Sequence, residues 1–178
     1  PLYWVCRDDN GRSKRVYRQN RDGGPSELLY DEEDPGFFVS VGASDGENYI
    51  VINAGGHTSN EIRVLDAADP TAEPMLIAAR EDGVEYYLTE ATDRFYFRTN
   101  ADGAVDFKIV TAPLDNPGRE NWEDFVAHRP GVLVNGVIGF EDWLVRSERE
   151  NALPRIVVHE YATGEEHEIA FAEEAYSL

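Results

Sequence analysis

The sequence predicts an all-β chain that forms part of a β-propeller, and three observations support this. Short runs rich in β-branched and aromatic residues recur along the chain, and turn-forming residues separate them. A plan of four such runs repeats at a nearly constant period. No stretch keeps apolar residues at helical spacing for ten or more positions, because Gly and Pro interrupt each one. We therefore expect about three and a half to four four-stranded blades.

Three complete repeats carry this plan. The first, within residues 35–81, has its runs at 37–41, 49–52, 61–65 and 75–77. The second, within 82–130, has them at 84–88, 94–99, 107–110 and 122–127. The third, within 131–178, has them at 132–140, 143–147, 155–159 and 168–171. The repeats open 47 and 48 positions apart, and about 40–50 residues is the period of a propeller blade.

Residues 1–34 are interpreted as an incomplete blade that holds only its last three strands. These runs lie at 2–6, 15–18 and 27–30, and Asp9-Asn10-Gly11 supplies a tight turn between the first two. Residues 1–178 would then be a fragment of one propeller domain. A β-sandwich would also give short alternating strands, but the constant period favours the propeller.

The charge composition limits the classes of partner. The chain has 35 acidic and 16 basic residues and a formal net charge of −19. Such a charge repels nucleic acid and anionic membranes and attracts cationic ligands. A solvated acidic surface is the plainer interpretation of the same numbers. No apolar run reaches the length of a membrane span, so we expect neither a nucleic acid nor a membrane as partner.

The cysteine content and the first residue bear on location. Cys6 is the single cysteine, so it cannot form an intrachain disulfide, and we expect it to be buried and inert. The lack of disulfides favours the cytoplasm, with the periplasm as the alternative. The sequence starts at Pro1 rather than Met, which suggests a segment of a longer polypeptide.

One motif resembles a catalytic nucleophile. Gly42-Ala43-Ser44-Asp45-Gly46 matches the G-x-S-x-G pattern in which a serine sits between a strand and a helix. Strand-forming residues follow it here, and Ser-Asp-Gly is also typical of a hairpin turn, because Asp and Gly tolerate positive φ. We therefore expect Ser44 to lie in the turn between the first two strands of a blade.

Other polar clusters are interpreted as structural. The four histidines, His57, His128, His159 and His167, lack metal-ligand spacing, and the glycine-rich loop around His57 lacks a following helix that could bind phosphate. We expect Asp31-Glu32-Glu33-Asp34 to be a solvated connection between blades. Residues 147–151 are expected to form a charged loop between strands. Four apolar side chains are expected to pack between adjacent blades: Phe95, Phe97, Trp143 and Val157.

Several of these stretches together resemble the propeller domain of the prolyl oligopeptidase family, most closely its oligopeptidase B branch. Residues 147–155 are similar to the "RENGLPR" segment of that branch, and residues 95–114 to its "F-Y-I-R-T-N … N-F-x-L-x-x-A-P-L" blade. Further similarity lies at 51–52, 56–61, 121–123, 128–129 and 173–176. Two departures are visible, Asp106 where the family usually has Asn and Ala152 where it usually has Gly.

The resemblance implies a parent enzyme in which a seven-bladed propeller covers an α/β-hydrolase domain with a Ser-Asp-His triad, and which cleaves short peptides after Lys or Arg. The triad lies outside this chain, so we expect no catalytic residue, metal or cofactor here, and we assign no substrate-binding residue. The propeller would restrict access to short peptides. Its partners would be the hydrolase domain of the same chain and short basic peptides.

A non-enzymatic propeller that binds other proteins is the alternative, although the chain lacks the WD-repeat pattern of the commonest scaffolds. In either case the end blades of a fragment would expose apolar faces, through which we expect self-association or marginal stability as a monomer.

Overall fold

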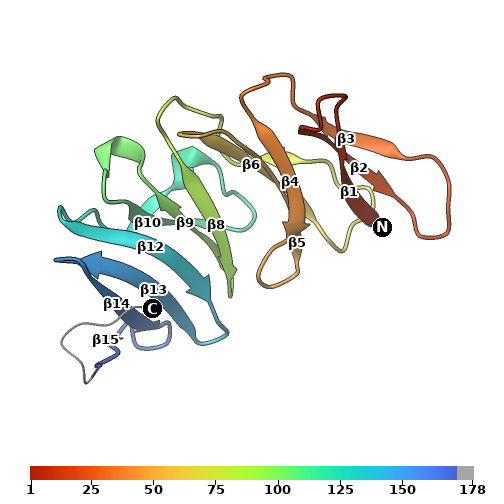
Figure 1. Ribbon diagram of the computed structural model, residues 1–178. Coiled ribbons are helices and arrows are strands. Elements are labelled where there is room, and N and C mark those ends of the chain that lie inside the picture. The colour runs from red at the N-terminus through yellow and green to blue at the C-terminus, as the bar shows by residue number, and fades with distance from the viewer. Residues whose placement is uncertain (172–178) are drawn as a thin grey trace. The chain divides into compact units, whose positions relative to one another are not determined.

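Four antiparallel sheets make up the computed structural model, which describes residues 1–171 (Figure 1). The first sheet contains β1 (Leu2–Arg7), β2 (Ser13–Gln19) and β3 (Glu27–Asp31). The second contains β4 (Phe38–Ala43), β5 (Tyr49–Gly55), β6 (Asn60–Asp66) and β7 (Met75–Leu76). The third contains β8 (Tyr86–Ala91), β9 (Arg94–Thr99), β10 (Lys108–Pro113) and β11 (Glu123–Val126). The fourth contains β12 (Val132–Gly139), β13 (Trp143–Glu150), β14 (Leu153–Glu160) and β15 (Glu166–Glu168).

Each sheet is a meander, because its strands follow one another in the sequence and each pairs with the next one (Figure 1). Two short 3₁₀ helices, η1 (Ala101–Gly103) and η2 (Arg119–Asn121), lie in the connections of the third sheet. None of the helices in residues 1–171 has the length and apolarity needed to cross a membrane.

The chain divides into two compact units, residues 1–85 and 86–178. In the first unit, β4 lies against β1 and β2, and the first and second sheets share one apolar core. Its buried members are Val16, Val39, Ile52, Ala54 and Leu65. Buried and half-buried positions alternate in the second half of β2 and of β5, because successive side chains of a strand point to opposite faces and only one face meets the core.

In the second unit, β12 lies against β8 and β9, and the third and fourth sheets share a second core. Its buried members are Ala91, Tyr96, Ile109, Val126, Val134 and Leu144. Where the ends of β8 and β12 meet, the two strands approach so closely that a Cβ on Gly139 would lie 2.6 Å from the Cβ of Ala91. The close packing therefore requires glycine at position 139.

The predicted fold class is confirmed, since these antiparallel meanders, three of which have four strands, are part of a β-propeller domain. Most predicted strands match the observed ones within a few residues, including the three strands of the incomplete first sheet. The last predicted strand was placed too late, because β15 spans Glu166–Glu168 and not residues 168–171. Residues 173–176, similar to the family's next inter-blade segment, lie outside the described residues. The blade limits and the assignment to a single domain stay predictions.

Two side chains differ from their expected environment. Trp143 is 43% exposed, because it lies on the face of β13 opposite Leu144, which is the residue that packs into the core. Cys6 is half-buried on β1 rather than fully buried. Phe95, Phe97 and Val157 are buried, and their packing between adjacent blades stays a prediction.

Candidate functional site

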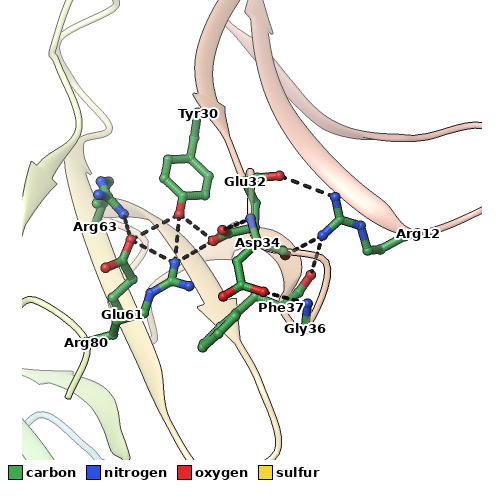
Figure 2. A network of polar contacts seen from close by, with 9 residues as sticks. All are labelled: Arg12, Tyr30, Glu32, Asp34, Gly36, Phe37, Glu61, Arg63 and Arg80. Atoms are coloured by element: carbon green, nitrogen blue, oxygen red, sulfur yellow. Dashed lines mark hydrogen bonds and ion pairs between the residues drawn. The ribbon is translucent and has the colours of Figure 1, made fainter. Parts of the chain in front are cut away.

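A network of charged side chains gathers around the connection between β3 and β4 (Figure 2). Glu32 follows β3 and is 4% exposed, and Glu61 near the start of β6 is 8% exposed. Arg80, from the connection between β7 and β8, reaches both carboxylates. Its Nη2 donates to Oε2 of Glu32 and lies 3.3 Å from Oε1 of Glu61. The guanidinium of Arg80, in the β7–β8 connection, thus links the β3–β4 connection to strand β6.

Tyr30 lies between the same two carboxylates. Its hydroxyl oxygen is 2.7 Å from Oε2 of Glu32 and 3.0 Å from Oε1 of Glu61 (Figure 2). The hydroxyl has a single proton, so it can donate to only one of the two at a time. Burial, followed by the hydrogen bond to Glu32, raises the pKa of Tyr30 far above its usual value. The tyrosine therefore remains a neutral donor across the physiological pH range.

The network balances two negative charges with two positive ones. Arg63 donates to Glu61 at 2.6 Å, and its guanidinium lies 4.4 Å from the centroid of the Tyr30 ring. Burial alone would raise the pKa of Glu61, but hydrogen bonds from Arg80 and Arg63 outweigh it and lower that pKa to about 2. Arg80 also stacks on the ring of Phe37, with 3.7 Å between the guanidinium carbon and the ring centroid.

Arg12 holds the other side of the β3–β4 connection. It lies in the turn between β1 and β2, where its Nε donates to Oδ2 of Asp8 at 3.1 Å. Its two Nη atoms donate to the backbone carbonyls of Glu32, Asp34 and Phe37 (Figure 2). The connection is thus held on one side by Arg12 and on the other by Arg80.

A second network lies in the fourth sheet. Glu148 on β13 is fully buried, and its Oε1 accepts hydrogen bonds from Arg129 and from Nε of Arg146, the latter at 2.6 Å. Arg146 also donates from Nη1 and Nη2 to the two carboxylate oxygens of Glu166, at 2.5 and 2.8 Å. Arg129 lies in the connection between β11 and β12, so this network also ties an inter-sheet connection to a strand.

Asp106 also holds the connection between β11 and β12. Its carboxylate accepts from the backbone N–H of Gly131 at 2.9 Å, and its carbonyl accepts from the N–H of Val134 at 2.9 Å. Nε2 of His128 accepts from the N–H of Asp106 at 3.3 Å. The side chain of Asp106 thus contributes one hydrogen bond to this loop, and its backbone contributes two more.

Both networks pair guanidinium groups with carboxylates, an arrangement that fixes connections in place. A catalytic nucleophile would instead need a hydroxyl or thiol within hydrogen-bond reach of a base. The hydroxyl of Ser44 contacts backbone groups. Its Oγ lies 3.2 Å from the carbonyl oxygen of Tyr49 and accepts from the N–H of Tyr49 at 3.0 Å. The hydroxyl thus closes the hairpin between β4 and β5, and a strand follows it.

The turn geometry at this hairpin differs from the expectation in one respect. The positive φ, 59°, belongs to Glu47, whereas Asp45 and Gly46 were expected to adopt it. The backbone N–H of Glu47 donates to the carbonyl of Ser44 at 3.0 Å. The loop between Ala43 and Tyr49 is therefore longer than a two-residue turn, and its left-handed residue comes after Gly46.

Two predicted surface segments are corrected by the structure. Glu32 belongs to a stretch expected to be solvated, yet it is buried, because three donors satisfy its carboxylate: Tyr30, Arg80 and the N–H of Asp34. Residues 147–150 were expected to form a loop, yet they continue β13. The buried partners Arg146 and Glu148 neutralise each other there, which allows a charged sequence to stay in a sheet.

The histidines lie apart in different environments. His57 and His167 are exposed, His128 contacts Asp106, and Nδ1 of His159 is 3.3 Å from Glu166. Across residues 1–171, no three His, Cys, Asp or Glu side chains are grouped to hold a metal ion. The functional residues that sequence reasoning missed are the network members Arg12, Arg80, Glu61, Arg129 and Glu148. The charges at 146 and 148, which are two positions apart directly after the apolar run 143–145, were the one signal for the last of these.

Comparisons with known proteins cover nearly the whole chain. The family model described as "Prolyl oligopeptidase, N-terminal beta-propeller domain" matches residues 2–178. Dipeptidyl aminopeptidase BI of Pseudoxanthomonas mexicana is 38% identical over 99% of this chain and 25% of its own length. Protease 2 of Moraxella lacunata is 26% identical over the same shares of the two chains.

Solved structures agree with the fold. Oligopeptidase B from Leishmania major superposes with a TM-score of 0.84 at 24% identity, over 97% of this chain and 26% of that one. Oligopeptidase B from Trypanosoma brucei, with covalently bound antipain, gives 0.82 at 25% identity over the same shares. The chain spans about a quarter of the length of these relatives.

Proposed function

Because this chain belongs to the prolyl oligopeptidase family, as part of its N-terminal β-propeller domain, we propose that it is the non-catalytic, substrate-gating part of a serine oligopeptidase. The observation that carries the proposal is the family match over residues 2–178. The catalytic domain would be another part of the same polypeptide, and the propeller would admit short, flexible peptides and exclude folded proteins.

We propose short peptides with Lys or Arg before the cleaved bond as the substrates of the whole enzyme. Two observations support this. Relatives named oligopeptidase B and protease 2 share the fold or the sequence, and the net charge of −19 attracts cationic peptides. The two ion-pair networks fit a gating role, because fixed connections keep the rim of a propeller rigid while substrate passes it.

A dipeptidyl aminopeptidase is the second candidate activity for the whole enzyme. It is favoured by the 38% identity to the relative of that name. The two candidates differ in the need for a free substrate N-terminus. An enzyme that releases dipeptides requires a free N-terminus, whereas an oligopeptidase that cleaves after Lys or Arg also hydrolyses N-terminally blocked substrates. Assaying the full-length enzyme on blocked and unblocked Arg peptides of equal length separates them.

The first test concerns catalysis by residues 1–178 alone. We expect no hydrolysis of Arg or Lys esters and amides by this chain, because its serine in the G-x-S-x-G motif is held in a hairpin. Turnover that disappears in Ser44→Ala would contradict the proposal. Turnover that persists in that variant would point to a contaminating hydrolase, which an active-site-directed fluorophosphonate would label at a different mass.

The second test concerns gating in the full-length enzyme. Glu61→Gln removes a buried charge that Arg80 and Arg63 share, so we expect looser connections and a several-fold rise in kcat/KM for long peptides relative to dipeptide substrates. Glu33→Gln is the matched control, because Glu33 lies in the β3–β4 connection that the network holds and its side chain is exposed. An equal change for long and short substrates, or equal effects of the two variants, would argue against gating by this part of the propeller.

A further inference from the structure

Arg21 is the one basic residue of residues 1–171 that is exposed and lies outside the helices and strands. Of the 16 Lys and Arg residues, eleven lie in strands and one lies in η2. The remaining four, Arg12, Arg21, Arg80 and Arg129, lie in connections between strands. Three of these are ion-paired and half-buried, whereas Arg21 is exposed. The peptide bond after Arg21 thus combines a basic side chain, a loop position and exposure.

The loop between β2 and β3 can open at a low cost in free energy. All residues from Asn20 to Leu28 are exposed. Gly23 and Gly24 adopt φ of 95° and 107°, and glycine changes its backbone angles more readily than other residues. Gly23 donates to the carbonyl of Asn20 at 3.1 Å, and the Gln19 side chain donates to that of Gly24 at 2.5 Å. A protease binds the residues around the cleaved bond in an extended conformation, so these contacts must break before cleavage.

We propose that the bond between Arg21 and Asp22 is a processing site for a serine protease that cleaves after Lys or Arg and accepts folded proteins as substrates. Water adds across this bond: the C–N bond breaks, the carbonyl carbon of Arg21 gains the hydroxyl group, and the nitrogen of Asp22 gains the proton. The inference concerns this chain as a substrate, so it is independent of the proposed gating function.

Contacts on both sides of the loop would hold the two pieces together after the cut. Strands β2 and β3 are joined by four pairs of residues. Arg18 on β2 is 4% exposed, and it donates to Oε2 of Glu27 on β3 and to the carbonyl of Ala72, each at 2.7 Å. Val16 from one piece and Leu29 from the other belong to the same apolar core. We therefore expect the cut to give a two-chain form that keeps its fold.

Limited proteolysis of the full-length polypeptide tests the site. Any catalytic serine is first blocked with a fluorophosphonate and the excess reagent is removed, so that trypsin is the one active protease. Mass spectrometry then follows the new N-termini within residues 1–178 over time. We expect the first to be Asp22, formed about tenfold or more faster than a cut after any other Lys or Arg of this chain. In size-exclusion chromatography the two pieces should elute together without denaturant and separately in urea.

Two substitutions provide the variant and its matched control. Arg21→Gln should remove the early cut. Arg149→Gln should leave it unchanged, because Arg149 is also exposed but lies within β13, paired with Leu133 and Pro154. Both replace an exposed side chain, so neither should disturb folding. An earlier cut after another basic residue, the absence of any cut within the chain, an early cut that persists in Arg21→Gln, or pieces that separate without denaturant would overturn the proposal.

Discussion

Glu32, Glu61 and Glu148 are carboxylates whose side chains lie almost entirely inside the protein. A buried charge is tolerated when other charges and hydrogen bonds compensate for the lost hydration. Glu32 and Glu61 share Arg80 and Tyr30. Glu148 has Arg129 and Arg146, although both contacts use Oε1, and Oε2 has no hydrogen-bond partner within residues 1–171. Removing one partner from such a pair typically destabilises a protein by about 3–5 kcal/mol.

The ion pairs of Glu61 predict a dependence of stability on pH. The folded-state pKa is about 2, below the ordinary value of 4.5, so the carboxylate stabilises the fold fully above about pH 4.5 and loses this contribution as the pH falls toward 2. The pKa of Glu32 is also lowered: burial opposes the shift, and hydrogen bonds from Arg80 and Tyr30 outweigh it. We expect the first unit to lose stability in this window.

The measurement is a urea titration at steps between pH 7 and pH 2. Trp4 is the single tryptophan of residues 1–85, so replacing Trp122 and Trp143 with Phe leaves a fluorescence probe of the first unit. We expect the Glu61→Gln variant to have a lower free energy of unfolding than the parent at pH 7. Below pH 4.5 this free energy should change less with pH than that of the parent. Parallel curves for Glu61→Gln and the parent would show that this carboxylate does not carry the dependence. Glu33→Gln should follow the parent.

At the scale of elements, the hairpin of β13 and β14 contains a strained residue. The turn between Glu150 and Leu153 consists of Asn151 and Ala152, with φ of 51° and 68°. Asn tolerates this left-handed conformation, but alanine adopts it at a cost of about 1 kcal/mol. Glycine at this position would adopt positive φ without a steric penalty.

Ala152→Gly should therefore stabilise the second unit by about 0.5–1 kcal/mol, since relief of strain exceeds the added entropy of the unfolded chain. Thermal unfolding monitored through Trp122 and Trp143, in a Trp4→Phe background, measures the change. Ala162→Gly is the matched control, because Ala162 lies in an exposed turn and its φ is not positive. That control should be neutral or destabilising. A decrease in stability for Ala152→Gly would show that strain does not limit this turn.

The sequence predicted the number of sheets and most strands because local features determine them. Turn residues and alternating runs such as 94–99 carry this information in neighbouring positions. The course of β13 could not be predicted in the same way. Whether a run of Arg and Glu is a loop or a strand depends on partners far away in the sequence, such as Glu166 for Arg146. The first network was missed for the same reason, because Arg80 and Glu32 are 48 positions apart.

At the scale of the whole molecule, the fourth sheet has an exposed apolar face. Ile138, Phe140 and Trp143 are 56%, 53% and 43% exposed. Ile138 pairs with Val145, and Trp143 lies two residues before Val145, so these side chains share one face. The opposite face carries Leu144, which packs against the third sheet. An exposed apolar face of this kind favours association.

We expect the isolated chain to self-associate through this face in a concentration-dependent way. Multi-angle light scattering over a dilution series measures the molar mass, and Ile138→Asp combined with Trp143→Asp should shift the equilibrium toward the monomer. The control adds the same two negative charges at exposed positions of a nearby turn, as Ala162→Asp combined with Thr163→Asp. A monomer at all concentrations, with a high unfolding temperature, would contradict this expectation.

The meander order of the sheets has a consequence for how the chain folds during synthesis. Within each sheet, every strand pairs with the strand before or after it in the sequence. The contacts of each sheet are therefore local, and closing the short loops between its strands costs little conformational entropy. Ribosomes add about 5–20 residues per second, which is slower than the formation of hairpins, about 1–10 μs. Each meander can therefore form soon after its last strand emerges.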